Sequence, residues 1–201
     1  MVLVTKLTLE VILVKVEPIR KVSDIKKIKK LLLSQGKLRD LALFITGINT
    51  GLRTQDLLAL RVGQVEGVAV GERVSITEKK TGKPNVLIVN EEIRSVLDRY
   101  LATRPERKPE EYLFMSRKYL NQPLSVYAVT HYVQSWCDQI GLKGNFGAHT
   151  FRKTWCLQMR TQYGVSWELL AKRLNHSSPA VTRRYMGVQD DEVEQILLNK
   201  V

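Results

Sequence analysis

The chain has 201 residues, enough for one domain or, less favourably, two small ones. Its composition, 44% hydrophobic and 26% charged, is that of a globular protein, and no apolar stretch approaches the length of a membrane span. The 32 Lys+Arg against 20 Asp+Glu give a net charge of +12, which indicates a polyanionic partner. Nucleic acid is the commonest partner of this kind and is favoured here over an anionic membrane surface.

The N-terminal segment and the cysteines bear on the compartment. Residues 2–16 are apolar but interrupted by charges, and they lack the basic start, long apolar stretch and cleavage site of a signal peptide. Cys137 and Cys156 lie in helical patterns with no Cys or His at ligand spacing, so we expect buried, reduced thiols and no metal site. Both observations favour a cytoplasmic protein.

The first part of the chain is expected to be an arm followed by helices. Residues 1–20 have strand-like content with poor alternation and are interpreted as an N-terminal arm or linker, and residues 21–201 as one domain. Apolar spacing among lysines then predicts a helix with Ser23 or Asp24 as its cap and Gly36 at its end. Two further helices are expected, one at about 38–48 and a short one capped by Thr54 with Asp56 in its first turn.

Between residues 64 and 89 the pattern changes to β-branched runs. VEGVAV, RVSIT and NVLIV are separated by Gly71-Glu72 and by KKTGKP, which predicts a small antiparallel sheet of three strands. Asn90 then caps a helix, and further helices are expected at 125–140 and at about 150–163, 166–174 and 190–199. The predicted fold class is α+β and mainly helical, with one small three-stranded antiparallel sheet.

The stretch from Ala148 to Tyr185 holds residues that can act on a phosphodiester. AHTFRKTW places His149 and Arg152 on one helix face, and LNHSSPAVTRRY places His176 before Tyr185. Cleavage without metal needs a nucleophile, cations for the phosphate oxygens, a proton donor for the leaving oxygen and a base or orienting group. The chain has a candidate for each of these roles. Metal-dependent nuclease chemistry is less favoured, because the carboxylates are scattered and the acidic run at 190–194 fits the start of a helix better than a two-metal site.

Three segments together resemble the tyrosine recombinases, the family of phage integrases and Xer-type resolvases. TGLRTQDLLALRVGQV resembles their first signature, AHTFRKT their His-x-x-Arg element, and LNHSSPAVTRRYM their second His followed by the nucleophilic Tyr. The matches stand in family order, cover about residues 38–187, and have a β-rich segment with a Lys between the first and second. The resemblance implies the catalytic fold of that family and a reaction without a cofactor.

The resemblance also assigns roles to the cations around the phosphate. Arg53 and Arg152 would hold its non-bridging oxygens, since a planar guanidinium donates two bonds and stays charged. His149 would orient or deprotonate the nucleophile, and His176 would donate to a phosphate oxygen.

The remaining roles concern the leaving group and the nucleophile. Lys80, at the tip of the expected hairpin, would protonate the departing 5′ oxygen, but Lys79 and Lys83 flank it and the choice among the three stays open. Tyr185 would attack and leave a 3′-phosphotyrosyl ester and a free 5′ hydroxyl. Asp56 resembles the acidic residue that supports the active-site Arg and His in this family.

The sequence departs from the family pattern in two places. Asn175 stands where the family usually has Gly, and Asn also tolerates the left-handed conformation. About 37 residues precede the first signature, too few for the separate N-terminal domain with which most members clamp the other face of DNA. The sequence is then either a catalytic fragment or a compact member similar to the fimbrial phase-variation invertases. Lys21–Lys30 would supply part of the missing grip, or it is a solvated helix face.

The predicted function is that of a site-specific DNA recombinase of the integrase type. One alternative is a regulator of the same fold that binds DNA without cleaving it, and another is a type IB topoisomerase, which nicks and reseals one duplex with a similar site. The resemblance implies double-stranded DNA as partner, a homotetramer on DNA and a monomer without it. The apolar helix expected after Tyr185 would dock on a neighbouring subunit or fold back on its own domain.

Overall fold

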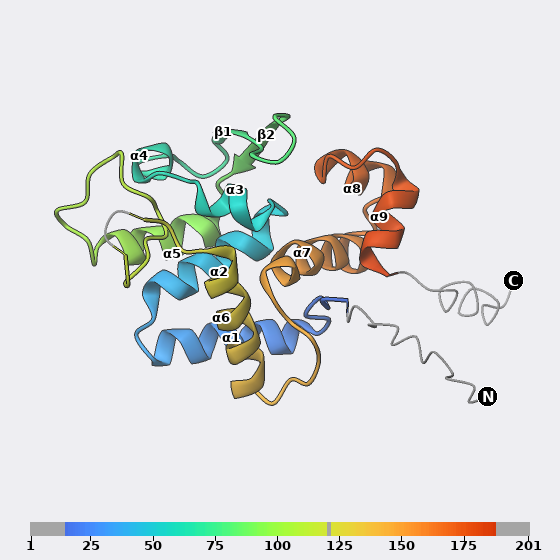
Figure 1. Cartoon of the computed structure of the whole chain (residues 1–201), viewed down its shortest axis with the longest axis horizontal. Helices are drawn as coiled ribbons and strands as arrows, with labels where there is room; N and C mark the ends of the chain where they lie inside the picture. Colours follow the sequence, from blue (N-terminus) through green and yellow to red (C-terminus); the bar gives the residue numbers. More distant parts are fainter. Residues whose placement is uncertain (1–14, 120–121, 188–201) are drawn as a thin grey trace, which may run out of the picture.

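The computed structural model describes residues 15–119 and 122–187, and within them helices surround one main hydrophobic core and carry a single β-hairpin (Figure 1). None of the helices in these ranges is long and apolar enough to cross a membrane. The elements in chain order are α1 (Val22–Ser34), α2 (Leu38–Thr50), α3 (Thr54–Leu58), α4 (Val62–Val65), β1 (Arg73–Thr77), β2 (Pro84–Ile88), α5 (Glu91–Leu101), α6 (Val126–Gln139), α7 (Ala148–Tyr163), α8 (Trp167–Arg173) and α9 (Pro179–Met186).

Helix α2 lies at the centre of the core and packs against α1, α5 and α7. Its residues are buried on nearly every side, as expected for a helix that is apolar all round. The Phe44 ring meets the rings of Trp136 in α6 and Phe151 in α7 edge-on, with centroids 5.9 and 6.0 Å apart. At Gly47 an added Cβ would lie 2.5 Å from Cδ2 of Phe151, so α2 and α7 approach closely there. This contact positions the first turns of α7.

Most of the predicted helices are present, with two corrections at their starts. The side chains of Asn90 and Ser125 cap α5 and α6, as predicted. Helix α1 instead begins at Val22, so Ser23 and Asp24 lie within its first turn. Thr54 lies inside α3, and its hydroxyl donates to the carbonyl of Ala148 at 2.7 Å. The Thr54 side chain therefore ties α3 to the start of α7 rather than capping its own helix.

The predicted sheet has two strands in the described residues, not three. β1 and β2 pair antiparallel in the register Arg73↔Ile88 to Thr77↔Pro84. In the first β-branched run, Val65 ends α4 and Gly67 turns the chain with φ +71°. The carbonyls of Val65 and Val68 accept hydrogen bonds from Nη1 of Arg94, at 2.8 and 3.2 Å. The Arg94 side chain, from α5, thus supplies the hydrogen bonds that a neighbouring strand would otherwise donate to these carbonyls.

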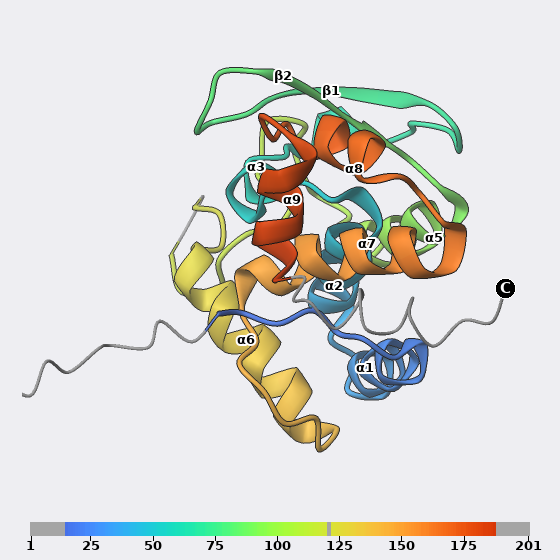
Figure 2. The ribbon, with the colours of Figure 1, turned by 90° about the vertical axis from the view of Figure 1, so that its right-hand side faces the viewer.

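One helix was absent from the sequence prediction. In α9, Ser178 is the N-cap and accepts from the amide of Val181, while Pro179 occupies the first turn. Ser followed by Pro is a helix-start signal that the sequence does contain. Helix α9 packs beside α8 and contacts α7 (Figure 2). The helix expected at about 190–199 lies outside the described residues.

The two cysteines are confirmed as buried, free thiols. Cys137 is enclosed in the main core, and Cys156 belongs to a small cluster between α7 and α8. Burial raises the pKa of Cys137 to about 12 and that of Cys156 to about 11. Both groups therefore remain protonated thiols at neutral pH.

Candidate active site

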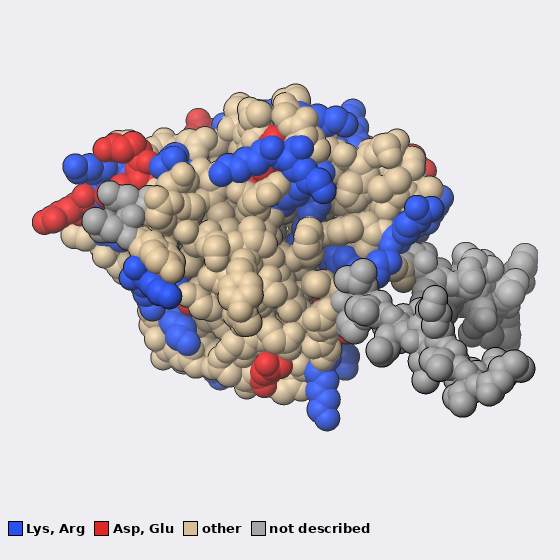
Figure 3. Space-filling model, viewed as in Figure 1, with Lys and Arg blue, Asp and Glu red and all other residues tan. Residues whose placement is uncertain are grey.

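The predicted residues come from five separate parts of the chain and meet between the β-hairpin and α7. Figure 3 shows Lys and Arg side chains around a hollow in this region. One pocket there, of about 210 Å³, is lined by Arg53, Lys80 and His149, together with Thr54, Gln55 and Val126. The contributing segments are the start of α3, the β1–β2 loop, the first turns of α7, the α8–α9 connection and the end of α9.

The Tyr185 hydroxyl faces His149. The oxygen lies 3.4 Å from Nδ1 of His149, and the two rings stand nearly perpendicular with centroids 6.3 Å apart. Burial raises the pKa of Tyr185 to about 12, although the charges of Arg152 and Arg53 oppose the shift. Desolvation, followed by the charges of Arg152 and Lys153, lowers the pKa of His149. At neutral pH a neutral imidazole is therefore placed to accept the phenol proton.

Two backbone carbonyls hold the buried guanidinium of Arg152 in place. It is only 2% exposed, and Nη1 donates to the carbonyl of Gly51 at 2.8 Å while Nη2 donates to that of Leu174. These bonds tie together the end of α2 and the end of α8. Burial lowers the pKa of Arg152 to about 10, so the group keeps its positive charge at neutral pH. The two carbonyl bonds thus fix the guanidinium, and within residues 15–119 and 122–187 no carboxylate forms an ion pair with it.

His176 lies between Arg152 and α9. Its Nε2 is 3.5 Å from Nη2 of Arg152, and its Nδ1 is 2.9 Å from the hydroxyl of buried Thr182. Desolvation and the charges of Arg152 and Arg53 lower the pKa of His176 to about 4. The ring is therefore neutral at pH 7. Because a guanidinium can only donate, Nε2 accepts from Arg152 in this structure, and the proton on Nδ1 is donated to the Thr182 hydroxyl. In the other tautomer Thr182 donates to Nδ1, and Nε2–H is then free to donate to an anionic oxygen.

Glu78 is a central residue of the site that sequence reasoning missed. Its side chain is fully buried and pairs with Nη1 of Arg53, and it accepts from Thr81 and from the amides of Asn85 and Asn175, at 2.8 and 3.0 Å for the amides. Burial acts to raise the pKa of Glu78, but these hydrogen bonds and the Arg53 charge outweigh it and lower the pKa to about 2. A lone Glu at the end of a strand gave no local signal of this role.

The Asp56 carboxylate binds the backbone of the β1–β2 loop. The carboxylate is buried, and Oδ1 accepts from the amide of Lys79 at 2.8 Å. Desolvation raises the pKa of Asp56 despite this bond and the nearby Arg53 charge. The contact fixes the backbone just before Lys80. Lys79, Lys80 and Lys83 are all exposed, and of the three only Lys80 lines the pocket.

The departure at Asn175 is accommodated with an added contact. Its φ is +50°, the left-handed conformation that was expected for this position. The side-chain amide donates to Oε1 of Glu78, a bond that a glycine could not make. Asn175 therefore links the α8–α9 connection to the hairpin.

The Glu78 network leads to a prediction about stability. Glu78→Gln is expected to lower the free energy of unfolding at pH 7 by about 3 kcal/mol, because the folded state holds the carboxylate pKa near 2 against an ordinary 4.5. Stability from a lowered pKa is present above about pH 4.5 and is lost as the pH falls towards 2. The difference between wild type and variant should therefore shrink over that window, as measured by urea unfolding at successive pH values.

Glu66 provides the control for this experiment. It forms an exposed pair with Arg107, so Glu66→Gln is expected to change stability by less than about 1 kcal/mol. A Glu78→Gln deficit that stayed constant between pH 6 and pH 3 would show that the carboxylate charge is not what stabilises the site.

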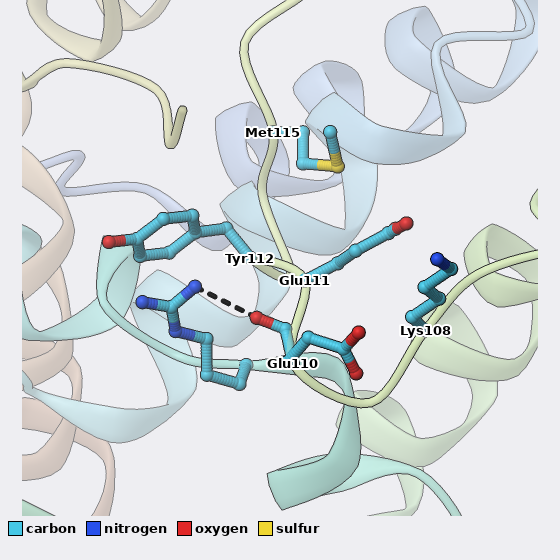
Figure 4. Close-up of a pocket in the computed structure, with 6 residues that line it drawn as sticks. Lys108, Glu110, Glu111, Tyr112 and Met115 are labelled. Carbon is cyan, nitrogen blue, oxygen red and sulfur yellow. Dashed lines mark hydrogen bonds between the residues drawn. The ribbon is translucent and has the colours of Figure 1, made fainter. Parts of the chain in front are cut away.

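A second hollow lies away from these residues, beside the loop that precedes α6 (Figure 4). This pocket has a volume of about 270 Å³. The Arg61 guanidinium stacks on the Tyr112 ring at 3.5 Å and donates to the carbonyl of Glu110 at 2.8 Å. These contacts fasten the loop to the start of α4, and none of the predicted catalytic residues lines the pocket. Across residues 15–119 and 122–187 no three His, Cys, Asp or Glu side chains are grouped as for a metal ion.

Comparison with known sequences identifies the family. The model of the phage integrase family matches residues 20–192. YoeC of Bacillus subtilis (strain 168), named as a probable integrase/recombinase, is 34% identical over 88% of this chain and 92% of that protein. The tyrosine recombinase XerC of Caldanaerobacter subterraneus subsp. tengcongensis is 27% identical over 79% of this chain, which spans 44% of that relative. The chain belongs to the phage integrase family, and its assignment as a tyrosine site-specific recombinase is confirmed at that level.

Solved structures agree with the fold. A crystal structure of XerA recombinase superposes with a TM-score of 0.71 at 19% identity, covering 92% of this chain and 67% of that one. XerH recombinase bound to its difH substrate gives a TM-score of 0.68 at 19% identity, covering 92% and 55%. The predicted catalytic fold is therefore confirmed, with two strands in the described residues where three were expected.

Proposed function

We propose that the chain cleaves and rejoins double-stranded DNA at specific sites through Tyr185. The observation that carries the proposal is the placement of the Tyr185 hydroxyl 3.4 Å from a neutral His149, beside the rigidly held Arg152. DNA as the partner is supported by the net charge of +12 and by related structures that contain DNA, those of XerH and the Tn1549 integrase.

The reaction exchanges one phosphate ester for another. The bond from the Tyr185 oxygen to phosphorus forms as the bond from phosphorus to O5′ breaks. The phenol proton passes to His149, and a proton from Lys80 passes to O5′. Arg53 and Arg152 bind the non-bridging oxygens while negative charge builds up on them.

His176 and the supporting carboxylates complete this arrangement. With its proton on Nε2 and Thr182 donating to Nδ1, His176 donates to a non-bridging oxygen. Glu78 holds Arg53, and Asp56 holds the backbone that carries Lys80. The resulting phosphotyrosyl ester keeps the energy of the broken bond. A free 5′ hydroxyl can therefore attack it and reseal the strand in the reverse reaction.

The test of the function is covalent capture. A duplex that carries the recombination site and a nick next to the cleavage position loses a short 5′-hydroxyl fragment after attack, so the protein remains attached to the 3′ end. A band stable to denaturant and sensitive to protease supports the proposal. Binding to the correct site without any adduct would favour a regulator that does not cleave. Relaxation of supercoiled DNA without sequence preference would favour a topoisomerase, and synapsis of two defined sites a recombinase.

Assembly is part of the same proposal. On two DNA sites we propose a homotetramer, and without DNA a monomer. Sedimentation of the free protein and of its complex with a two-site DNA measures both states. A complex that stays at one protein per site under saturating protein would contradict the tetramer.

The identity of the general acid can be tested with a sulfur substitution. Lys80→Met is expected to slow cleavage of an ordinary phosphodiester by about 10²- to 10³-fold, because O5′ would leave without a proton. The variant should recover on a substrate with sulfur at the 5′ bridging position, since a thiolate leaves without protonation. Adduct formation on the two substrates, followed over time on denaturing gels, measures the effect.

The neighbouring lysines are the matched controls. Lys79→Met and Lys83→Met remove the same charge from the same loop and should keep most of the activity on both substrates. Sulfur rescue of Lys79→Met or Lys83→Met, in place of Lys80→Met, would move the general acid to that residue.

A further inference from the structure

Residues 15–20 lie against α7 and reach the helix that carries Tyr185 (Figure 2). We refer to residues 15–20 as the N-terminal clamp. Three polar residues on one face of α7 bind its backbone: Thr150 donates to the carbonyl of Glu17 at 2.8 Å, and Thr154 accepts from the amide of Ile19 at 2.9 Å. Gln158 donates to the carbonyls of Ile19 and Arg20. The clamp is therefore bonded to α7 over about two helical turns.

The clamp is anchored at both ends. Glu17 exchanges backbone and side-chain hydrogen bonds with Asn145, in the loop before α7. Ile19 is fully buried in the main core. These contacts show that the clamp is an integral part of the packed domain, although the sequence pattern placed residues 1–20 in an arm or linker.

Lys15 links the clamp to α9. Its Nζ donates to the carbonyl of Arg184 at 2.6 Å, at the C-terminal end of α9. The carbonyls of a helix end carry partial negative charge, so an ammonium group there stabilises the last turn. Arg184 directly precedes Tyr185. The bond therefore holds the turn that carries the nucleophile.

Lys153 supports the nucleophile from the other side. It follows Arg152 on α7, is only 4% exposed, and its Nζ lies 5.1 Å from the centre of the Tyr185 ring. It forms no ion pair with a carboxylate of the described residues. A buried ammonium with no ionic partner is costly, and the ring face compensates part of the cost. Burial, followed by the charge of Lys15, lowers the pKa of Lys153 to about 8, while the charge of Glu17 acts to raise it, so charges of the clamp act on this lysine.

We propose that the N-terminal clamp positions Tyr185 for attack, through the bond from Lys15 to the end of α9 and through Lys153 beneath the nucleophile ring. This inference rests on the proposed cleavage by Tyr185. Lys15 and Lys153 are positioning residues, since neither is placed to touch the phosphate.

The first test separates attack from DNA binding. At saturating DNA, Lys153→Met is expected to slow adduct formation by about tenfold to 100-fold, because small displacements of a reacting group cost that much. Lys15→Met removes one helix-end contact and should slow it by about two- to fivefold. Affinity for DNA should change much less in both variants. Lys153→Arg keeps a cation against the ring and should recover most of the lost rate.

The control is Lys172→Met, which removes an exposed lysine from α8 and should leave the rate of adduct formation at saturating DNA unchanged. Wild-type rates in both Lys153→Met and Lys15→Met would overturn the proposal. So would an equal loss of rate in Lys153→Met and Lys153→Arg, since a packing role alone would explain it.

The second test does not depend on cleavage. Hydrogen exchange of the free protein should be faster at the amides of Met186 and Gly187 in Lys15→Met than in wild type, because the last turn of α9 loses a contact. Unchanged exchange there would overturn the clamp even if DNA were cleaved. If wild type formed no adduct on any site, the proposed function would fail, and exchange would still decide whether the clamp holds α9.

Discussion

Tyr185→Phe is expected to bind the recombination site as wild type does and to form no covalent adduct. The variant lacks only the attacking oxygen, so the loss should be on the order of 10⁴-fold or more. The ring contacts with His149, His176 and Lys153 remain, since they involve the ring face and edges. Stability should therefore stay close to that of wild type.

The measurement is the nicked-duplex capture on a denaturing gel, with thermal unfolding as the check on folding. Tyr163→Phe is the matched control, because Tyr163 is 69% exposed at the end of α7 and has no role in the proposed reaction. It should form adduct at the wild-type rate. An adduct in Tyr185→Phe, mapped by peptide mass to another tyrosine, would assign the nucleophile elsewhere.

Arg152→Lys is expected to slow cleavage by about 10²- to 10³-fold at saturating DNA, although the charge is retained. Lysine cannot present the planar pair of donors that a guanidinium offers to a phosphate. It also cannot reach the carbonyls of Gly51 and Leu174 together, so at least one buried acceptor loses its partner. The free energy of unfolding should therefore fall by about 1–3 kcal/mol.

Single-turnover cleavage and urea unfolding of the same preparations separate the two effects. Arg160→Lys, on the same helix, replaces an arginine that stacks on Trp167, and it should leave cleavage near wild type. Loss of stability in Arg152→Lys with wild-type cleavage would reduce Arg152 to a structural role. Loss of cleavage with unchanged stability would show that the two carbonyl bonds contribute little to folding.

Local patterns predicted most of the helices because their signals lie within a few residues. Asn90 and Ser125 cap their helices through bonds to amides three residues later. The strand predicted at the first β-branched run, VEGVAV, is absent from the described structure for the opposite reason. Its β-branched residues favour an extended chain, but the partner for its carbonyls is Arg94, about 26 to 29 residues further on. A pattern within a few residues cannot predict a hydrogen bond to a side chain so distant in sequence.

The site divides in the same way. Arg53, His149, Arg152 and Tyr185 stand in motifs with recognisable spacing, and the structure brings them together with His176. Glu78 had no motif of its own. Its role follows from the folding of the hairpin over α3 and the α8–α9 connection, which encloses the carboxylate with Arg53 and Asn175.

The sequence by itself determined the family, the helical character and the chemical types of the catalytic candidates, because each depends on residue identity and short-range spacing. The stretch from Ala148 to Tyr185 carries much of that information. Only the tertiary structure decided how the side chains are held: Arg152 by carbonyls from two distant turns, Arg53 by Glu78, and Tyr185 between His149 and Lys153. Burial and electrostatic contacts between segments far apart in sequence set those positions and the pKa values, and they exist only once the chain has folded.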